Sequence, residues 1–323
     1  MTVTRWGILS TARINEKVLA GAALTDEAEV VAVASRDQAY ADAYARDHGI
    51  GRAHGSYEAL LADDNVDAVY ISLPNGLHVE WSIRALEAGK HVLCEKPLSR
   101  RAVDVEAVFD TAEAVDRFCM EAFMWRHNPQ TRKLTELVAG GTIGDLRLVR
   151  AAFSFPLADL GNVRMSRELD GGSLMDVGCY CVSGARLLGG EPVRVTAQQL
   201  TGSTGVDVRF VAALSFRGGV LAHLDSALDL PDRSELEAIG SDGSIRVDDP
   251  WHCLRPGLTI RRGDEVERVE VEPANSYMLE LENLGRAIRG DTHPLLGRED
   301  AVGQARAIEA LYRAADSGEA VEL

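Results

Sequence analysis

Two residues of this chain, a lysine and a tyrosine, are of the types that together move a proton on and off an alcohol. Lys96 follows the apolar run His91–Cys94, so it stands at the carboxyl edge of a predicted strand, where parallel sheets bind ligands. Tyr180 lies four residues after Asp176, which puts both side chains on one face of a predicted helix. An ammonium close to a phenol lowers the phenol pKa and helps it to exchange a proton with a substrate hydroxyl. Lys96, Tyr180 and Asp176 are therefore candidate catalytic residues.

These three residues also have structural explanations, which the residues alone leave open. Lys96 stands before a proline and is compatible with an exposed position. Ser173-x-x-Asp176 has the spacing of a capping box, in which the carboxylate only closes a helix N-terminus. Tyr180 is compatible with half-buried packing whose hydroxyl reaches water. If Lys96 and Tyr180 are catalytic and lie close together, their apparent pKa values belong to the pair and not to either residue. The formal acid or base is then either Lys96 or Tyr180.

A phosphate-binding turn is expected directly after the first apolar strand, residues 6–9. Read as G-x-G-x-x-G, its fingerprint positions hold Ser10, Ala12 and Asn15 instead of glycine, so an ordinary strand-to-helix turn is the alternative. Serine and alanine are the smallest replacements, and the free N–H groups of a helix N-terminus still attract phosphate. The expected contacts to a pyrophosphate are Ser10, Thr11, Ala12, Arg13 and Ile14.

The end of the second predicted strand, Glu29–Ala34, indicates which nicotinamide cofactor is used. An acidic residue at this point would bind the ribose 2′-hydroxyl of NAD and repel a 2′-phosphate. The chain instead has Ser35, a hydroxyl donor, and Arg36, whose guanidinium is suited to a phosphate. This predicts NADP as the cofactor, and Asp37, which follows directly, leaves NAD possible.

Four further segments carry a resemblance to a known family. They are Leu73-Pro74-Asn75-Gly76-Leu77-His78, the run 89–97 with Glu95-Lys96-Pro97, the run 121–130 with Phe123-Met124-Trp125-Arg126, and Gly171-Gly172-Ser173-Leu174-Met175-Asp176-Val177-Gly178-Cys179-Tyr180. With these segments in this order, nearly the whole chain resembles the glucose–fructose oxidoreductase / inositol dehydrogenase (Gfo/Idh/MocA) family. Most branches have histidine at the last position of the fourth segment. The tyrosine here resembles the branch of dimeric trans-dihydrodiol dehydrogenase and NADP-dependent D-xylose 1-dehydrogenase.

The resemblance implies an NAD(P)-dependent oxidoreductase that transfers hydride at a CH–OH group of a sugar, a polyol or a related diol. It also implies that Lys96, Tyr180 and Asp176 are the catalytic residues. It further implies a cis Lys96–Pro97 peptide bond that aims the lysine, and it gives Asp176 the role of orienting substrate hydroxyls or the lysine. The further cofactor contacts that we expect are Leu73, Pro74, Asn75, His78, Glu95 and Lys96, with a helix N-terminal role as the alternative for His78. The substrate-binding residues that we expect are Trp125, Arg126, Phe155, Asp176 and Tyr180, the first three of which have interdomain packing as the alternative.

The elements that must position these residues change in character along the chain. Up to residue 122, apolar runs of four to six residues alternate with helical patterns, which predicts a doubly wound Rossmann domain over 1–122. After residue 123, tight turns such as Ser241-Asp242-Gly243 separate long strand-like runs and leave no room for crossover helices. Residues 123–323 are therefore expected to form an α+β domain on a large, mostly antiparallel open sheet. The expected strands are 146–155, 193–200, 206–216, 220–228 and 235–239, and the expected closing helices are 276–288 and 300–315.

Composition limits the class of protein. The chain has 323 residues, which favours two domains, and a formal charge of 34 − 50 = −16, which argues against a nucleic-acid partner. It has no apolar stretch of membrane-spanning length and no signal-peptide pattern, so we expect a cytoplasmic protein without a membrane partner. Its five cysteines and eight histidines lack the spacing of metal ligands, so we expect reduced thiols and no metal.

Three other functions fit the same scaffold. The first is a trans-dihydrodiol dehydrogenase acting on aromatic-derived diols. The second is a non-catalytic NAD(P)-binding sensor, which the presence of both Lys96 and Tyr180 disfavours. The third is NAD-assisted glycoside hydrolysis, which the NADP-like Ser35-Arg36 pair disfavours. For any of these, an open sheet face rich in Val, Leu and Phe predicts a homodimer or a dimer of dimers built on that face.

Overall fold

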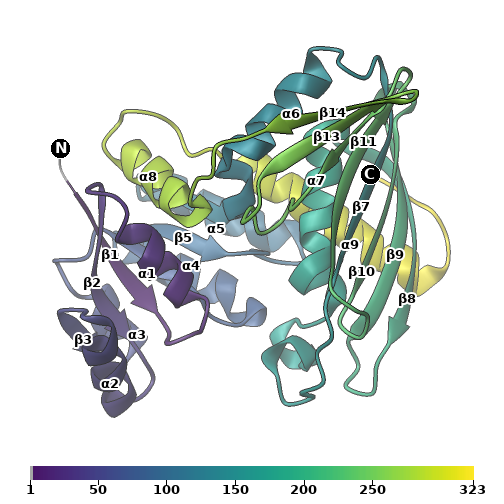
Figure 1. Cartoon of the computed structure of the whole chain (residues 1–323). Coiled ribbons are helices and arrows are strands. Elements are labelled where there is room, and N and C mark those ends of the chain that lie inside the picture. The colour runs from purple at the N-terminus through teal and green to yellow at the C-terminus, as the bar shows by residue number, and fades with distance from the viewer. Residues whose placement is uncertain (1–2) are drawn as a thin grey trace. The chain divides into compact units, whose positions relative to one another are not determined.

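The computed structural model describes residues 3–323, and contacts within the chain divide it into two compact units. Unit 1 holds the chain up to residue 99 together with 103–124 and 275–302, and unit 2 holds 100–102, 125–274 and 303–323. The sequence predicted that all of 123–323 belong to the second domain, whereas residues 275–302 belong to unit 1. Their helix α8 (Ser276–Ile288) lies beside α1 (Asn15–Ala22) (Figure 1). Gly21 permits this packing, because a Cβ there would lie only 2.8 Å from the Met278 backbone nitrogen.

Unit 1 is built on a parallel sheet of six strands, as the alternating pattern predicted (Figure 1). The strand order is β3-β2-β1-β4-β5-β6, so the order reverses between β1 and β4, where doubly wound sheets bind ligands. The sequence had not indicated β3, which is only three residues long. The strands are β1 (Thr4–Leu9), β2 (Ala28–Ala34), β3 (Arg52–His54), β4 (Ala68–Ile71), β5 (His91–Glu95) and β6 (Cys119–Ala122).

Helices flank this sheet, and several begin at side-chain caps. Asp37 accepts a hydrogen bond from the Tyr40 backbone N–H at 3.1 Å at the start of α2, and Ser56 caps α3 in the same way. α2 ends at Gly49, whose φ of +68° is the left-handed conformation that favours glycine. Besides α1 and α8, the helices of this region are α2 (Gln38–His48), α3 (Tyr57–Leu61), the short η1 (Asn75–Leu77), α4 (His78–Glu87) and α5 (Ala102–Ala114).

Unit 2 is built on a nine-stranded sheet in the order β14-β13-β12-β11-β7-β10-β9-β8-β15. The sheet is mostly antiparallel, as predicted, but β7 pairs with β10 in parallel. These two strands run in the same direction because a helix and two other strands separate them in the chain. The strands are β7 (Leu146–Ser154), β8 (Pro192–Thr201), β9 (Asp207–Phe216), β10 (Leu221–Ala227), β11 (Arg233–Gly240), β12 (Ser244–Val247), β13 (Gly257–Arg262), β14 (Glu265–Glu270) and β15 (Val321–Glu322).

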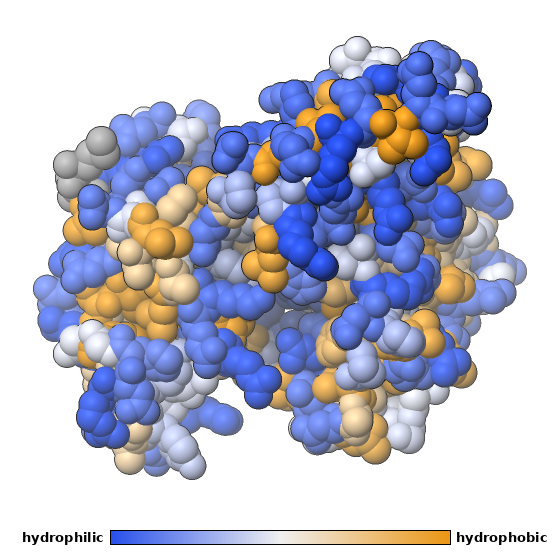
Figure 2. Space-filling view, viewed as in Figure 1, coloured by the Kyte–Doolittle hydropathy of each residue, from blue (hydrophilic) through white to orange (hydrophobic). Residues whose placement is uncertain are grey.

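The sequence pattern does not predict β12, β13 and β14, because these strands are short and β13 and β14 carry many charges. In β14 nearly every side chain is exposed, so the strand lacks the alternation that marks a half-buried strand. The space-filling view accordingly shows mostly hydrophilic side chains over the β13–β14 hairpin (Figure 2). Long-range pairing with β11 and β12, rather than local propensity, extends the sheet at this edge.

One face of this sheet is covered and the other is open. Phe153, Phe210 and Leu224 point to the covered face and are buried, and α7 packs there (Figure 1). Val211 and His223 stand on the opposite, exposed face. The helices of this region are α6 (Pro129–Ala139), α7 (Cys179–Gly189), which continues a π-helical turn η5 (Leu174–Gly178), and α9 (Arg298–Ser317). Within residues 3–323, none of the helices has the length and apolar character needed to cross a membrane.

Candidate active site

The turn between β1 and α1 has a positive φ at its first fingerprint position, although no glycine stands there. Ser10 has a φ of 114°, a conformation that usually requires glycine. Its hydroxyl stabilises the turn by accepting a hydrogen bond from the Ala12 N–H at 3.2 Å and by pairing with the Ser72 hydroxyl at 2.8 Å. The buried Asn15 amide donates to the Ser10 carbonyl at 2.9 Å. Side-chain hydrogen bonds therefore replace the missing glycines in fixing the loop.

This turn presents donors that suit a pyrophosphate. The backbone N–H groups of Thr11, Arg13 and Ile14 make no hydrogen bond within residues 3–323. They lie at the N-terminal end of α1, where the helix dipole favours negative charge. Thr11 and Arg13 are also exposed. The residues present therefore fit the dinucleotide that the fold implies.

The end of β2 presents a cation to a ribose phosphate. Arg36 is exposed, and its guanidinium makes no hydrogen bond or ion pair with any part of the chain that the structure describes. Ser35 stands beside it, half-buried. The neighbouring carboxylate of Asp37 is engaged as the cap of α2. The charge available at this position is therefore positive, which suits the 2′-phosphate of NADP better than the 2′-hydroxyl of NAD.

Lys96 leaves the end of β5 on a turn that two buried side chains hold. The Lys96–Pro97 peptide bond is cis, as the family resemblance implied. The next backbone N–H, that of Leu98, donates to Glu121 Oε1 at 2.7 Å. The Pro97 carbonyl lies 2.8 Å from His78 Nδ1. His78 and Glu121 are 0% and 1% exposed, so the half-buried Lys96 begins a turn that is fixed from inside the domain.

His78, which the sequence predicts as a cofactor contact, is buried and has a backbone carbonyl facing each of its ring nitrogens. Its Nε2 lies 2.7 Å from the Leu73 carbonyl, so the ring joins the two loops that end β4 and β5. Burial lowers the pKa of His78, although the two carbonyls that face its nitrogens act in the opposite direction. His78 is the first residue of α4, which agrees with the alternative expectation of a helix N-terminal role. In this structure His78 positions Leu73 and Pro97.

A buried group of acids and phenols lies behind the lysine. Glu95 Oε1 accepts a hydrogen bond from the Tyr70 hydroxyl, and Oε2 accepts one from the Lys96 backbone N–H at 3.3 Å. Burial raises the pKa of Tyr70 well above its ordinary value. Glu280 on α8 is 1% exposed, and its Oε1 has no hydrogen-bond partner within residues 3–323. Burial, with the charge of Glu95, raises the pKa of Glu280 well above its ordinary range, which favours the protonated form of this carboxyl.

In unit 2, Asp176 and Tyr180 lie on successive turns, as their spacing predicted. Asp176 belongs to the π-helical turn η5, a rare element that is frequent at functional sites, and Tyr180 belongs to α7. Asp176 is almost buried, and its Oδ2 accepts a hydrogen bond from Arg164 Nε at 2.8 Å. The Tyr180 ring packs edge-on against Phe153, with 5.4 Å between ring centroids. The sequence had not singled out Arg164 or Phe153.

The residues predicted as pocket walls lie in varied surroundings. Trp125 is 1% exposed and packs edge-on against Trp251, with 5.2 Å between centroids, so it belongs to the core of unit 2. Arg126 donates to the Ser183 hydroxyl at 3.3 Å. Phe155 is half-buried, two residues beyond the phenylalanine that touches Tyr180. The burial of Trp125 leaves little of its ring to meet a substrate.

Asp207 fixes the start of the η5 turn. It accepts hydrogen bonds from the Leu174 N–H and the Ser173 hydroxyl, both at 2.8 Å, and from the Tyr312 hydroxyl at 2.9 Å. Burial raises its pKa, which these hydrogen bonds partly offset. Gly172 has a φ of +121°, and a Cβ there would lie 2.2 Å from Asp207 Oδ1, so only glycine fits. No motif in the sequence indicates this network, because its members lie far apart in the chain.

Comparison with family models places the chain. Residues 4–123 match the oxidoreductase family with an NAD-binding Rossmann fold, and residues 131–246 match the GFO/IDH/MocA C-terminal domain. The chain belongs to the Gfo/Idh/MocA family. It is an NAD(P)-dependent oxidoreductase, as the motifs of the sequence predicted.

Several Gfo/Idh/MocA members resemble this chain over most of its length. D-xylose 1-dehydrogenase (NADP(+)) 2 of Haloferax volcanii is 42% identical, over 98% of this chain and 99% of that protein. Trans-1,2-dihydrobenzene-1,2-diol dehydrogenase of Xenopus laevis is 35% identical, over 82% of this chain and 80% of that protein. The crystal structure of a 3-ketoreductase from Actinomadura kijaniata in complex with NADP and TDP-benzene has a TM-score of 0.92 and 31% identity, over 97% of this chain and 98% of that one. The roles of individual residues in the present family member stay predictions.

Proposed function

We propose that this Gfo/Idh/MocA member is an NADP-dependent dehydrogenase or reductase of a sugar or polyol, acting at a CH–OH carbon. The observation that carries the proposal is the exposed guanidinium of Arg36 at the end of β2, which makes no hydrogen bond or ion pair within residues 3–323. The Asp176–Tyr180 face, which presents a carboxylate and a phenol, supports a hydroxyl-bearing substrate. The relatives that act on D-xylose and on a dihydrodiol support the same reaction type.

The proposed cofactor site follows the carboxyl edge of the unit 1 sheet. Thr11, Arg13 and Ile14 would bind the pyrophosphate through their backbone N–H groups, and Ser35 with Arg36 would bind the 2′-phosphate. The nicotinamide, when bound, accepts or supplies a hydride. The remaining residues proposed to line the cofactor are Ser10, Ala12, Leu73, Pro74, Asn75, Glu95 and Lys96.

The proposed proton route uses one residue of each unit. In the oxidative direction, the Tyr180 phenolate takes the proton of the substrate alcohol and becomes the phenol, and in the reductive direction the phenol gives this proton to the substrate oxygen. The Lys96 ammonium lowers the pKa of the phenol and binds the same substrate oxygen. Asp176 orients the other substrate hydroxyls. We propose that Lys96 and Tyr180 act on the same substrate oxygen. We also propose that Arg126 and Phe155 contact the substrate.

An activity screen tests this proposal. Purified protein is assayed against aldoses, inositols and a trans-dihydrodiol, each with NADP⁺ and with NAD⁺, by absorbance of the reduced cofactor. We expect turnover of an aldose or inositol with NADP⁺ and a much lower kcat/KM with NAD⁺. The Tyr180→Phe variant serves as a background control. Absence of cofactor reduction with every substrate, and of oxidation with the matching carbonyl compounds, would contradict the proposal.

The aromatic-diol dehydrogenase remains a second candidate, because Tyr180 has aromatic neighbours. Phe153 lies 5.4 Å and Trp251 5.9 Å from its ring, centroid to centroid. The Asp176–Arg164 pair beside this face favours a hydroxyl-rich substrate instead. The comparison of kcat/KM for an aldose and for trans-dihydrobenzenediol in the same screen decides between the two candidates.

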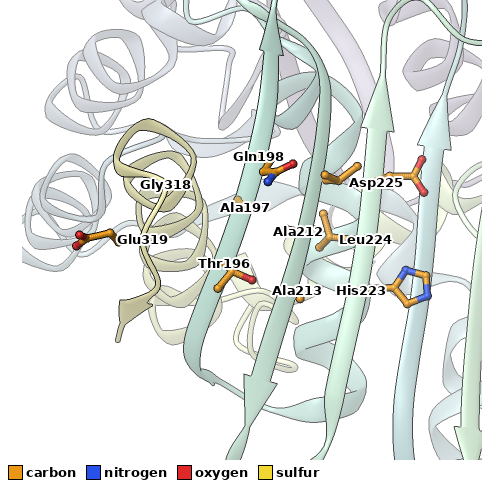
Figure 3. A pocket seen from close by; sticks show the side chains of 11 residues that line it. Thr196, Ala197, Gln198, Ala212, Ala213, His223, Leu224, Asp225, Gly318 and Glu319 are labelled. Carbon is orange, nitrogen blue, oxygen red and sulfur yellow. The ribbon is translucent and has the colours of Figure 1, made fainter.

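We also propose that the protein is a homodimer built on the open face of the unit 2 sheet. This face carries the exposed side chains of Val211 and Leu221, which are 50% and 52% exposed, beside the polar Thr196, Gln198 and His223. Figure 3 shows an open depression across β8, β9 and β10, with labelled side chains standing on neighbouring strands. An open face of mixed polarity suits contact with an identical face about a two-fold axis. The cytoplasmic location stays a prediction that fits an enzyme supplied with NADP.

A further inference from the structure

The loop that follows β7 brings an arginine onto the predicted catalytic carboxylate. Arg164 Nε donates to Asp176 Oδ2 at 2.8 Å. The carboxylate side chain is 12% exposed, whereas the arginine side chain is 45% exposed. The Arg164 Nη2 group makes no hydrogen bond within residues 3–323. One side of the pair is therefore nearly buried, and the other side presents N–H donors to a ligand.

The main chain holds this arginine in place. The Arg164 carbonyl accepts a hydrogen bond from the Gly172 N–H at 2.9 Å, and the Arg164 N–H donates to Asn162 Oδ1 at 3.1 Å. Gly171 allows this close approach, because a Cβ there would lie 2.3 Å from the Arg164 carbonyl oxygen. The buried Met165 side chain anchors the neighbouring residue. The loop is therefore tied to the residues that begin the η5 turn, and Arg164 is not a freely moving surface side chain.

The pair offers an acceptor and a donor next to each other. A partly exposed ion pair contributes little to stability, so stability gives a weak reason for this arrangement. Two adjacent hydroxyls are complementary to it, since one donates to a carboxylate while the next accepts from a guanidinium. The opposite charges cancel, so the pair suits a neutral polyhydroxyl compound.

We infer that Arg164 is a specificity-determining residue that, together with Asp176, binds two adjacent hydroxyls of the substrate. The inference rests on the proposed function, because it concerns the same site. It adds that the enzyme requires a hydroxyl beside the reacting carbon. A site built to hydrogen-bond a substrate hydroxyl rejects the analogue that lacks it, because its own polar groups are then left unpaired.

The test compares two sugars that differ in one hydroxyl, D-xylose and 2-deoxy-D-xylose, with NADP⁺ as the cofactor. The variants are Arg164→Met, which keeps length but removes the donors, and Arg164→Lys, which keeps the charge. Arg147→Met, which removes an exposed ion pair elsewhere on unit 2, is the matched control. We expect the wild-type enzyme to prefer D-xylose by about tenfold or more in kcat/KM. Arg164→Met should lower kcat/KM for D-xylose about ten- to hundredfold, mainly through KM, with little effect on 2-deoxy-D-xylose. Arg164→Lys should retain part of the preference.

The outcomes separate the inference from the proposed function. If the wild-type enzyme oxidises both sugars equally well, the inference is wrong and the proposed function stands. If Arg164→Met loses the same factor on both sugars, Arg164 only supports the loop, which also overturns the inference. Thermal unfolding shows whether each variant is folded. If Arg164→Met does not fold, the kcat/KM values of Arg164→Lys on the two sugars are compared with those of the wild type instead. If the wild-type enzyme oxidises no sugar with either cofactor, the proposed function fails and the inference with it.

Discussion

At the scale of single residues, one guanidinium carries the prediction of cofactor choice. Arg36 is exposed and makes no hydrogen bond or ion pair within the described part of the chain. Replacing it with alanine would therefore remove a contact to the phosphate without breaking another bond of the protein. A charge-assisted hydrogen bond contributes about 1.5–3 kcal/mol. Arg36→Ala should therefore weaken NADP binding about tenfold or more and leave NAD binding nearly unchanged, as measured by titration calorimetry. Arg46→Ala, at an exposed arginine on the nearby helix α2, is the control. Equal losses for both cofactors would remove Arg36 from 2′-phosphate recognition.

The proton route is also a residue-scale prediction. Positioned acid–base catalysis contributes about 10²–10⁴-fold. Tyr180→Phe should lower kcat by that order and leave NADP affinity nearly intact, because the proposed route uses the hydroxyl on the substrate and not on the cofactor. Lys96→Met should act on the same step, so the double variant should lose little more than either single one. Steady-state kinetics on the three variants check this. If Tyr180→Phe keeps nearly the wild-type kcat, Tyr180 is not the group that exchanges the proton, and Lys96 or Asp176 takes this role.

Glu280 gives a prediction on pH dependence. Its pKa in the folded protein is raised above the unfolded value, so the folded state binds the extra proton and stability falls as pH rises above about 4.5. Glutamine stays neutral at every pH. Glu280→Gln should therefore stabilise the protein by about 1 kcal/mol or more near pH 8, and the gain should shrink toward pH 5. Urea unfolding at both pH values measures it, with the exposed Glu299→Gln as the control. A gain that does not change with pH would contradict the assignment.

At the scale of elements, the turn that carries Asp176 depends on a distant strand. Asp207 on β9 receives three hydrogen bonds, two of them from the residues that begin η5. Tyr312→Phe removes one and should cost about 0.5–1.5 kcal/mol of unfolding free energy with kcat nearly unchanged. Asp207→Ala leaves buried donors unpaired, so it should cost more than about 2 kcal/mol and lower kcat as well. Denaturant unfolding and kinetics check both. Equal costs for the two variants would indicate that Asp207 does not organise η5.

At the scale of the whole molecule, the open sheet face predicts association. Light scattering at micromolar concentration should give twice the mass of the chain or a multiple of that. Val211→Glu places a carboxylate on the open face, so it should shift the mass toward the monomer with little change in thermal stability. Leu24→Glu, at an exposed apolar residue of unit 1, is the control and should leave the mass unchanged. A monomeric wild-type protein would refute this interface.

The sequence by itself determined the features that depend on neighbours along the chain. Hydrophobic periodicity is local, so the Rossmann alternation, most of the long strands and the spacing of Asp176 and Tyr180 followed from it. The four segments that include Glu95-Lys96-Pro97 together predicted the family, and the family resemblance in turn implied the cis bond. Arg36 stands directly after a recognisable strand. Each of these features is a pattern of residue types that can be recognised along the chain without knowing which distant segments meet.

Tertiary structure alone decided which distant residues meet and which polar groups are buried. It placed 275–302 with unit 1, gave His78 two backbone carbonyls and buried Trp125 and Glu280. It also brought Arg164 to Asp176 across a loop without a motif. The physical reason is that a side chain's burial and partners depend on which elements cover it. That covering is set by the packing of the whole chain, and no local pattern of residue types records it.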